Sequence, residues 1–212
     1  MIRTSRVIEH RCADRREVIW HPSVLGRDER WTALDQRGAT VLLTGLPASG
    51  GSTIAAELER RLVDLLDGDN IRRALTDDLG LSQGDRTEHI RRVGHVALLM
   101  ADSGTVAVVS LISPMAARRA HLREVHEHAE LTFVEVFVDT PLHECERRDP
   151  TGLHARARAG EITGFTGVDA PYEPPEHPEL RVDTSTTGVE QAVTQIIEIL
   201  RPRVGSKQRW PE

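Results

Sequence analysis

The residues best suited to chemistry form one run, Gly45-Leu46-Pro47-Ala48-Ser49-Gly50-Gly51-Ser52-Thr53. Glycines between an apolar strand and a helix start leave backbone N–H groups pointing at a phosphate, and the helix adds the positive end of its dipole. Phosphate-binding loops of this type follow G-x-x-x-x-G-K-[ST], and Gly51 stands where the lysine belongs. The sequence therefore predicts a phosphate site that keeps its backbone cradle and lacks its point charge. Its residues are Gly45, Ser49, Gly50, Gly51, Ser52 and Thr53.

Composition indicates that no other lysine replaces the lost charge. Lys207 is the only lysine among the 27 lysine and arginine residues. A general drift from lysine to arginine would explain an arginine at position 51, but it does not explain a glycine.

Three further polar clusters each follow an apolar segment. They are 67–72 (DGDNIR), 110–114 (SLISP) and 139–141 (DTP). Taken singly, each is ordinary turn or helix-cap chemistry. Ligands of open α/β sheets, however, bind at the carboxyl ends of the strands. Four such ends, the phosphate loop included, favour one shared site.

The spacing of apolar residues predicts the elements that position these clusters. Strands are expected at 39–44, 63–66, 105–110 and 132–138, and helices at 85–102 and 189–200. This alternation is typical of the α/β class, here a P-loop NTPase-like parallel sheet with helices on both faces. We expect a polar leader over 1–35, held to the domain by Trp20-His21-Pro22 and Trp31, one domain over 36–204, and a tail over 205–212. Residues 149–178, rich in glycine and proline, predict a lid.

Charge and cysteine content exclude several classes of function. A net charge of −6 and a pI near 5.9 argue against nucleic acid as a partner. Cys12 and Cys145 are too few and too far apart for a disulfide framework or a zinc site. The start of the chain lacks the apolar core of a secretory signal, and no run approaches the ~18 apolar residues of a membrane span. We expect a cytoplasmic protein with no membrane partner.

Over about residues 18–200 the chain resembles the adenylylsulfate (APS) kinase family. The likeness is carried, in order, by 66–72, Asp85-Arg86, 90–94, Ile112-Ser113-Pro114, 134–141, Arg148-Asp149-Pro150, 157–162, 165–169 and Pro171-Tyr172-Glu173. The resemblance implies transfer of phosphate from ATP, with Mg²⁺, to the 3′-hydroxyl of adenosine 5′-phosphosulfate. It also implies a homodimer.

The resemblance assigns a role to individual residues. Asp69 matches the carboxylate that accepts the hydroxyl proton and organises Mg²⁺, and Ser52 matches the hydroxyl of the loop on the Mg²⁺ side. Arg72 and Arg86 match the arginines that hold the phosphosulfate by bidentate pairing. The remaining matches are Phe165 on the APS adenine, Arg148 on the ATP adenine, Asp67 and Ile112 in the substrate site, Arg156 and Arg158 in the lid, and Ser113 at a possible phosphoserine position.

The chain departs from the family at several of these places. Besides Gly51, the family's phenylalanine is Leu81, its asparagine is His89, its arginine is Ala116, and a lid lysine is Ala155. The connection from Leu58 to Asp67 is also short. We expect His89 to be a surface histidine of its helix rather than a new hydrogen-bond donor.

Three functions stay open at this point. The first is a weakened APS kinase, and the second is a non-catalytic nucleotide-binding or regulatory protein. The third is an enzyme that uses APS or a related nucleotide in other chemistry.

Overall fold

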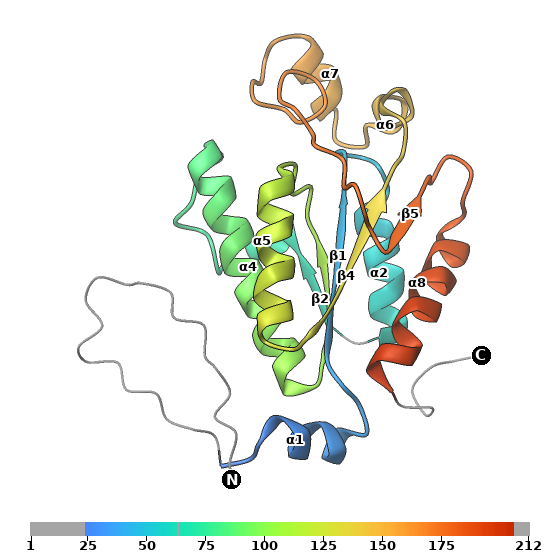
Figure 1. The fold of residues 1–212 in the computed structure, drawn as a ribbon. Helices are drawn as coiled ribbons and strands as arrows, with labels where there is room; N and C mark the ends of the chain where they lie inside the picture. The colour runs from blue at the N-terminus through green and yellow to red at the C-terminus, as the bar shows by residue number, and fades with distance from the viewer. Residues whose placement is uncertain (1–23, 63, 206–212) are drawn as a thin grey trace.

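Five parallel strands form the centre of the protein in a computed structural model that describes residues 24–62 and 64–205 (Figure 1). Their order across the sheet is β2-β3-β1-β4-β5. The strands are β1 (Ala39–Gly45), β2 (Asp64–Asp67), β3 (Val106–Ser110), β4 (Thr132–Val138) and β5 (Leu180–Val182). The four predicted strands are confirmed to within one residue at each end, although residue 63 lies outside the described part. The sequence pattern missed β5, which is three residues long and has a charged residue at its centre.

Helices cover both faces of the sheet, as the sequence predicts. In Figure 1, α2 and α8 lie on one face and α4 and α5 on the other. The helices are α1 (Arg27–Leu34), α2 (Gly51–Leu62), α3 (Gly68–Ile71), α4 (Gln83–Ser103), α5 (Ala116–His128), α6 (Leu142–Arg148), α7 (Leu153–Arg158) and α8 (Val189–Val204). The sequence pattern placed α4 and α8 correctly but ended α8 four residues too early.

The strands are apolar along their whole length because both faces are buried. All seven residues of β1 are buried. Its alternate side chains separate into two cores: Val41 and Leu43 pack with α2 and α8, and Leu42 packs with α4 and α5. A parallel sheet covered on both faces requires this continuous hydrophobic run.

The described part of the leader is a helix, which the sequence pattern did not predict. α1 lies at the end of the sheet opposite the phosphate loop (Figure 1). The indole N–H of Trp31 donates to the Asp102 carbonyl at 3.2 Å, and Arg27 and Arg30 both pair with the Asp102 carboxylate. Trp31 is thus the anchor that was expected. Trp20-His21-Pro22 lie outside the described residues.

The predicted lid segment stands over the carboxyl ends of the strands (Figure 1). It contains α7 and a turn closed by a bridge between Thr166 and Ala170. Among the described helices, none is long and apolar enough to cross a membrane.

Candidate active site

The phosphate loop is held from outside by hydrogen bonds to one carbonyl. The Ser49 carbonyl accepts from Thr140 Oγ1 at 2.9 Å, Thr184 Oγ1 at 2.7 Å and Arg148 Nη1 at 3.4 Å. Gly50 has φ +102°, a conformation that glycine adopts without strain. The loop backbone is therefore fixed by the ends of β4, β5 and α6, with no contribution from a side chain at position 51.

Gly51 opens α2, and the space around it would accept a side chain. A Cβ there would lie 3.6 Å from Ser110 Oγ, an ordinary contact, and its φ is not in the left-handed region. Gly45 is the opposite case, since a Cβ there would lie 2.5 Å from the Val138 carbonyl. The backbone thus demands glycine at position 45 but not at position 51.

Ser110, at the end of β3, lies between the phosphate loop and the polar cluster at 67–72. Its hydroxyl lies 3.5 Å from Ser52 Oγ, and its carbonyl lies 3.2 Å from a Cβ placed on Gly68. Asp69 follows Gly68 in the chain and is exposed. Asp67 Oδ1 accepts from the Asp69 and Asn70 N–H groups and caps α3. The structure brings together the residues that the sequence analysis assigned to two separate strand ends.

Two arginines reach this region without a carboxylate partner. Among the described residues, Arg72 and Arg86 form no ion pair; they donate to backbone carbonyls, Arg72 to Gly80 at 3.3 Å and Arg86 to Leu81 and Gly164, each at 2.9 Å. Arginine suits bidentate pairing with an anion, and these two guanidinium groups have unused capacity for one.

The lid contributes Phe165, whose ring contacts His154. The two rings meet edge to face at 4.9 Å, and His154 Nε2 donates to the Pro47 carbonyl of the phosphate loop at 3.0 Å. His154 is almost fully buried and links the lid to the loop. The sequence analysis did not select it, and its only signal was its place between the predicted Arg148 and Phe165.

The lid arginines are not brought into the site. Arg156 pairs with Glu161 at 3.2 Å, and Arg158 pairs with Glu146 at 2.6 Å. Arg148, in contrast, is fixed beside the loop. Its Nη1 donates to Thr184 Oγ1 at 2.7 Å and its Nε pairs with Glu144 at 3.0 Å.

The expectation that His89 is a surface residue is wrong. Its side chain is 2% exposed, because position 89 lies one helical turn before the buried Val93. Nδ1 is 2.8 Å from Thr76 Oγ1, while Nε2 has no hydrogen-bond partner among the described residues and lies 3.7 Å from a Cβ placed on Gly68. Burial, and then the charge of Arg72, lower the pKa of His89 to about 4, so the ring is neutral at pH 7. The spacing from Val93 was the signal that the sequence analysis overlooked.

Ser113 differs from what a phosphoserine position requires. Its Oγ is buried with no hydrogen-bond partner in the part of the chain that the structure describes, and its φ of 41° is in the left-handed region. A phosphoryl group cannot be attached there in this conformation. Ile112, beside it, is 39% exposed.

A cavity of about 570 Å³ lies next to this site, between the end of β4 and the second half of the lid segment. Its walls include Leu46, Phe137, Leu142 and Tyr172. The strand-end cluster 139–141 lines it, whereas none of the residues that were assigned individual roles does.

A parallel sheet, a glycine loop between β1 and α2, and polar clusters at neighbouring strand ends define a P-loop nucleotide-binding protein. Comparison with known proteins then gives the family. The family model described as adenylylsulphate kinase matches residues 37–183, and the chain belongs to this family.

Similar proteins agree with that membership. The chain is 50% identical over 177 residues to the bifunctional enzyme CysN/CysC of Mycobacterium tuberculosis, a match covering 80% of this chain and 29% of that protein's length. It is 49% identical over 189 residues to the adenylyl-sulfate kinase of Saccharomyces cerevisiae, covering 86% of this chain and 93% of that one. The structure of M. tuberculosis APS kinase CysC in complex with AMPPNP and APS superposes with a TM-score of 0.74 at 49% identity, covering 77% and 98% of the two chains.

Proposed function

We propose that this protein is an adenylylsulfate kinase of reduced rate, which phosphorylates the 3′-hydroxyl of adenosine 5′-phosphosulfate to give 3′-phosphoadenylyl sulfate. The observation that carries the proposal is the meeting, around Ser110, of the phosphate loop and the cluster that holds Asp69. A phosphoryl donor and an acceptor must meet at near-attack distance, and the contacts of Ser110 with Ser52 and with the Gly68 position support such a meeting.

The two substrates would occupy different sides of this site. On the donor side, residues 45–53 and Arg148, loop N–H groups hold the ATP phosphates and Arg148 lies against the adenine. On the acceptor side, Arg72 and Arg86 pair with the phosphosulfate, Phe165 stacks on the adenine, and Asp67 and Ile112 complete the wall. Asp69 accepts the proton of the 3′-hydroxyl at its carboxylate.

The oxygen donors present suit Mg²⁺. Ser52 Oγ and the carboxylates of Asp67 and Asp69 are hard ligands, which Mg²⁺ takes together with water and phosphate oxygens. Bound with ATP, Mg²⁺ would neutralise charge on the phosphates.

Substitution of Asp69 tests the proposal. Wild-type protein with Mg·ATP and APS should form 3′-phosphoadenylyl sulfate slowly, and Asp69→Asn should lower that rate by about 10²–10⁴-fold, the range for general-base catalysis. Asp77→Asn, at an exposed carboxylate of the following segment, is the control and should leave the rate unchanged. If saturating substrates give no product while APS binds, the kinase proposal fails.

That outcome would favour a second candidate, a non-catalytic nucleotide-binding member of the family. The observation in its favour is Gly51, which removes the loop cation without any demand from the backbone. The homodimer stays a prediction, to be checked by light scattering.

A further inference from the structure

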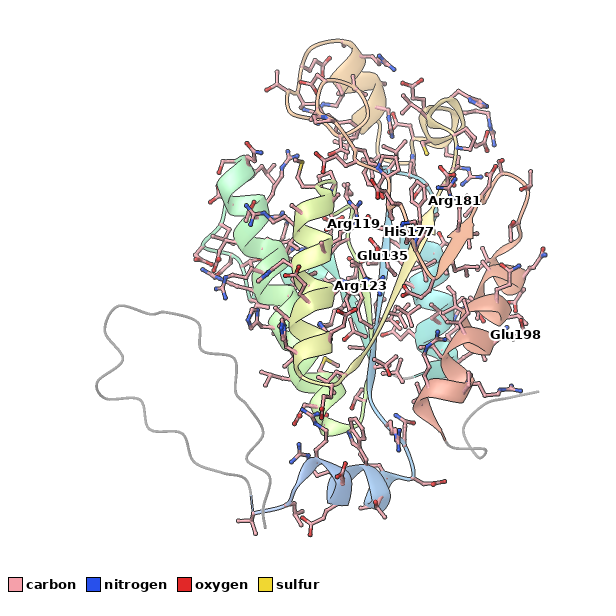
Figure 2. The ribbon with its side chains drawn as sticks, viewed as in Figure 1. Arg119, Arg123, Glu135, His177, Arg181 and Glu198 are labelled. Carbon is pink, nitrogen blue, oxygen red and sulfur yellow. The ribbon has the colours of Figure 1, made fainter. Side chains whose placement is uncertain are left out.

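A buried arginine on α5 joins three parts of the protein that border the site. Arg119 is 2% exposed, and its Nε donates to Glu135 Oε1 on β4 at 2.7 Å. Nη1 donates to the Ser113 carbonyl at 2.6 Å, and Nη2 donates to the Glu173 carbonyl at 2.5 Å. Figure 2 shows Arg119, Arg123 and Glu135 grouped between α5 and β4. Each of the three guanidinium nitrogens therefore donates a hydrogen bond.

The contacts tie together two segments, here called the acceptor loop (residues 111–115) and the return segment (residues 171–179, the chain that leaves the lid). Glu173 contacts the start of α5 and the loop before it: its N–H donates to the Pro114 carbonyl at 2.8 Å, and its carboxylate accepts from the Ala116 N–H at 2.6 Å. The lid is thus fastened at its exit to the loop that contains Ile112 and Ser113.

Tyr172 adds a second fastening between the same segments. Its hydroxyl is 2.9 Å from Thr44 Oγ1, which donates to the Ile112 carbonyl at 2.6 Å. Arg119 lies over its ring, 5.6 Å from the centroid. Burial raises the pKa of Tyr172 to about 12, so the hydroxyl keeps its proton.

The acceptor loop needs this support because its backbone is strained. Ser113 has φ 41°, and a non-glycine residue in the left-handed region is strained and persists only where its surroundings enforce it. The hydrogen bond from Arg119 to the Ser113 carbonyl holds Ser113 directly in this conformation. Loss of that bond would let Ser113 relax and would move the adjacent Ile112, which the proposed function assigns to the acceptor side.

We propose that Arg119 is a positioning residue for the acceptor nucleotide, which locks the acceptor loop to the return segment of the lid. The inference rests on the proposed function for the identity of the acceptor. Among the described residues, the hydrogen bonds, ion pair and ring contact of Arg119 include no residue of the phosphate loop. Its loss should therefore weaken the affinity for APS and leave the affinity for AMPPNP, an ATP analogue, unchanged.

The neighbouring Arg123 provides a matched control. It lies one helical turn further along α5 and pairs with Glu179 at 2.6 Å and Glu135 at 3.5 Å. Within the described part of the chain, its hydrogen bonds and ion pairs include neither Ser113 nor Glu173. Arg119→Met and Arg123→Met remove the same charge from the same helix while preserving the apolar stem. Only the first cuts the connection to the acceptor loop.

Hydrogen exchange without ligand is the first readout and needs no kinase activity. Arg119→Met should speed exchange in both the acceptor loop and the return segment, whereas Arg123→Met should speed it in the return segment alone. Calorimetry is the second readout. Arg119→Met should weaken APS binding about tenfold, the scale of a hydrogen bond from a charged donor, and leave AMPPNP binding within about twofold.

Each outcome decides the inference. Equal exchange in the acceptor loop of the two variants, or equal effects on APS affinity, would overturn it. If Arg119→Met does not fold, Tyr172→Phe replaces it as the test, since it removes only the contact to Thr44. This variant should weaken APS binding by a smaller factor than Arg119→Met would. Unchanged APS affinity in Tyr172→Phe would contradict the coupling. A wild-type protein that forms no product would refute the kinase proposal and leave the exchange result standing.

Discussion

The proposed donor and acceptor sides of the site lie at the same edge of one sheet but differ in unpaired positive charge, because Arg148 on the donor side pairs with Glu144. On the donor side the Ser49 carbonyl is held by three hydrogen bonds, while position 51 has no side chain. On the acceptor side Arg72 and Arg86 remain, with no ion pair among the described residues. The hydrogen bonds that hold the backbone of the phosphate loop are thus made by other residues than the one that would place a charge on the transferred phosphoryl group.

The comparison predicts that the missing charge at position 51 lowers the rate of phosphoryl transfer more than it lowers the affinity for nucleotide. Backbone N–H groups and the α2 dipole still favour phosphate. Phosphoryl transfer, however, depends on charge stabilisation, and one missing preorganised donor costs about 10²–10³ in rate. We therefore expect a protein that binds APS well, binds Mg·ATP less well, and reacts slowly. Calorimetry with tight Mg·ATP binding and no APS binding would reverse this ranking.

The largest effect should come from returning the lost charge. Gly51→Lys should raise the rate of 3′-phosphoadenylyl sulfate formation by about 10²-fold or more. Gly51→Ala is the matched control, since its Cβ meets only an ordinary contact with Ser110, and it should give no gain. If Gly51→Lys binds both nucleotides yet stays at the wild-type rate, the difference between the two sides is not the cause of slow transfer.

On the acceptor side the corresponding substitution is Arg86→Met. We expect APS affinity to fall by about tenfold or more, because a charged donor to an anion is lost, and Mg·ATP affinity to stay the same. Arg73→Met, an exposed arginine next to Arg72 in sequence, serves as the control. Calorimetry that shows equal losses for APS and Mg·ATP would remove the distinction between the two sides.

On the acceptor side, the buried His89 beside Gly68 should make the stability of the protein depend on pH. The His89 pKa of about 4 in the folded protein lies below the usual 6.5, so between pH 6.5 and pH 4 the unfolded chain takes up this proton and the folded protein largely does not. Its contribution to the free energy of unfolding should fall, as pH drops from 6.5 to 4, by up to about 1.4 kcal/mol per pH unit. Urea unfolding of His89→Asn should lack that part of the slope. His128→Asn, at an exposed histidine, should retain it.

The smallest effect concerns the lid. APS should slow hydrogen exchange in residues 149–170 several-fold, since they include Phe165 and the glycine turns. Residues 171–179 should already exchange slowly without ligand, because Arg119 and Arg123 hold them to α5 and β4. Unchanged exchange in 149–170 at saturating APS would argue against a lid.

Much of the fold follows from local pattern. The β-branched runs predict four strands, and the spacing of Ile90, Val93 and Ala97 predicts α4. β5 and α1 escaped prediction for opposite reasons: β5 is too short to show a period, and α1 has no buried residue to create one.

The sequence by itself determined the phosphate loop, the missing lysine and membership of the APS kinase family, because each is a statement about residue types in order. Only the tertiary structure decided the rest. Strand order placed Ser110 between the phosphate loop and Gly68, helix packing buried His89, and the path of the return segment brought Glu173 to Arg119. These contacts join residues far apart in the chain. Their burial and charge pairing therefore depend on neighbours that no local spacing specifies.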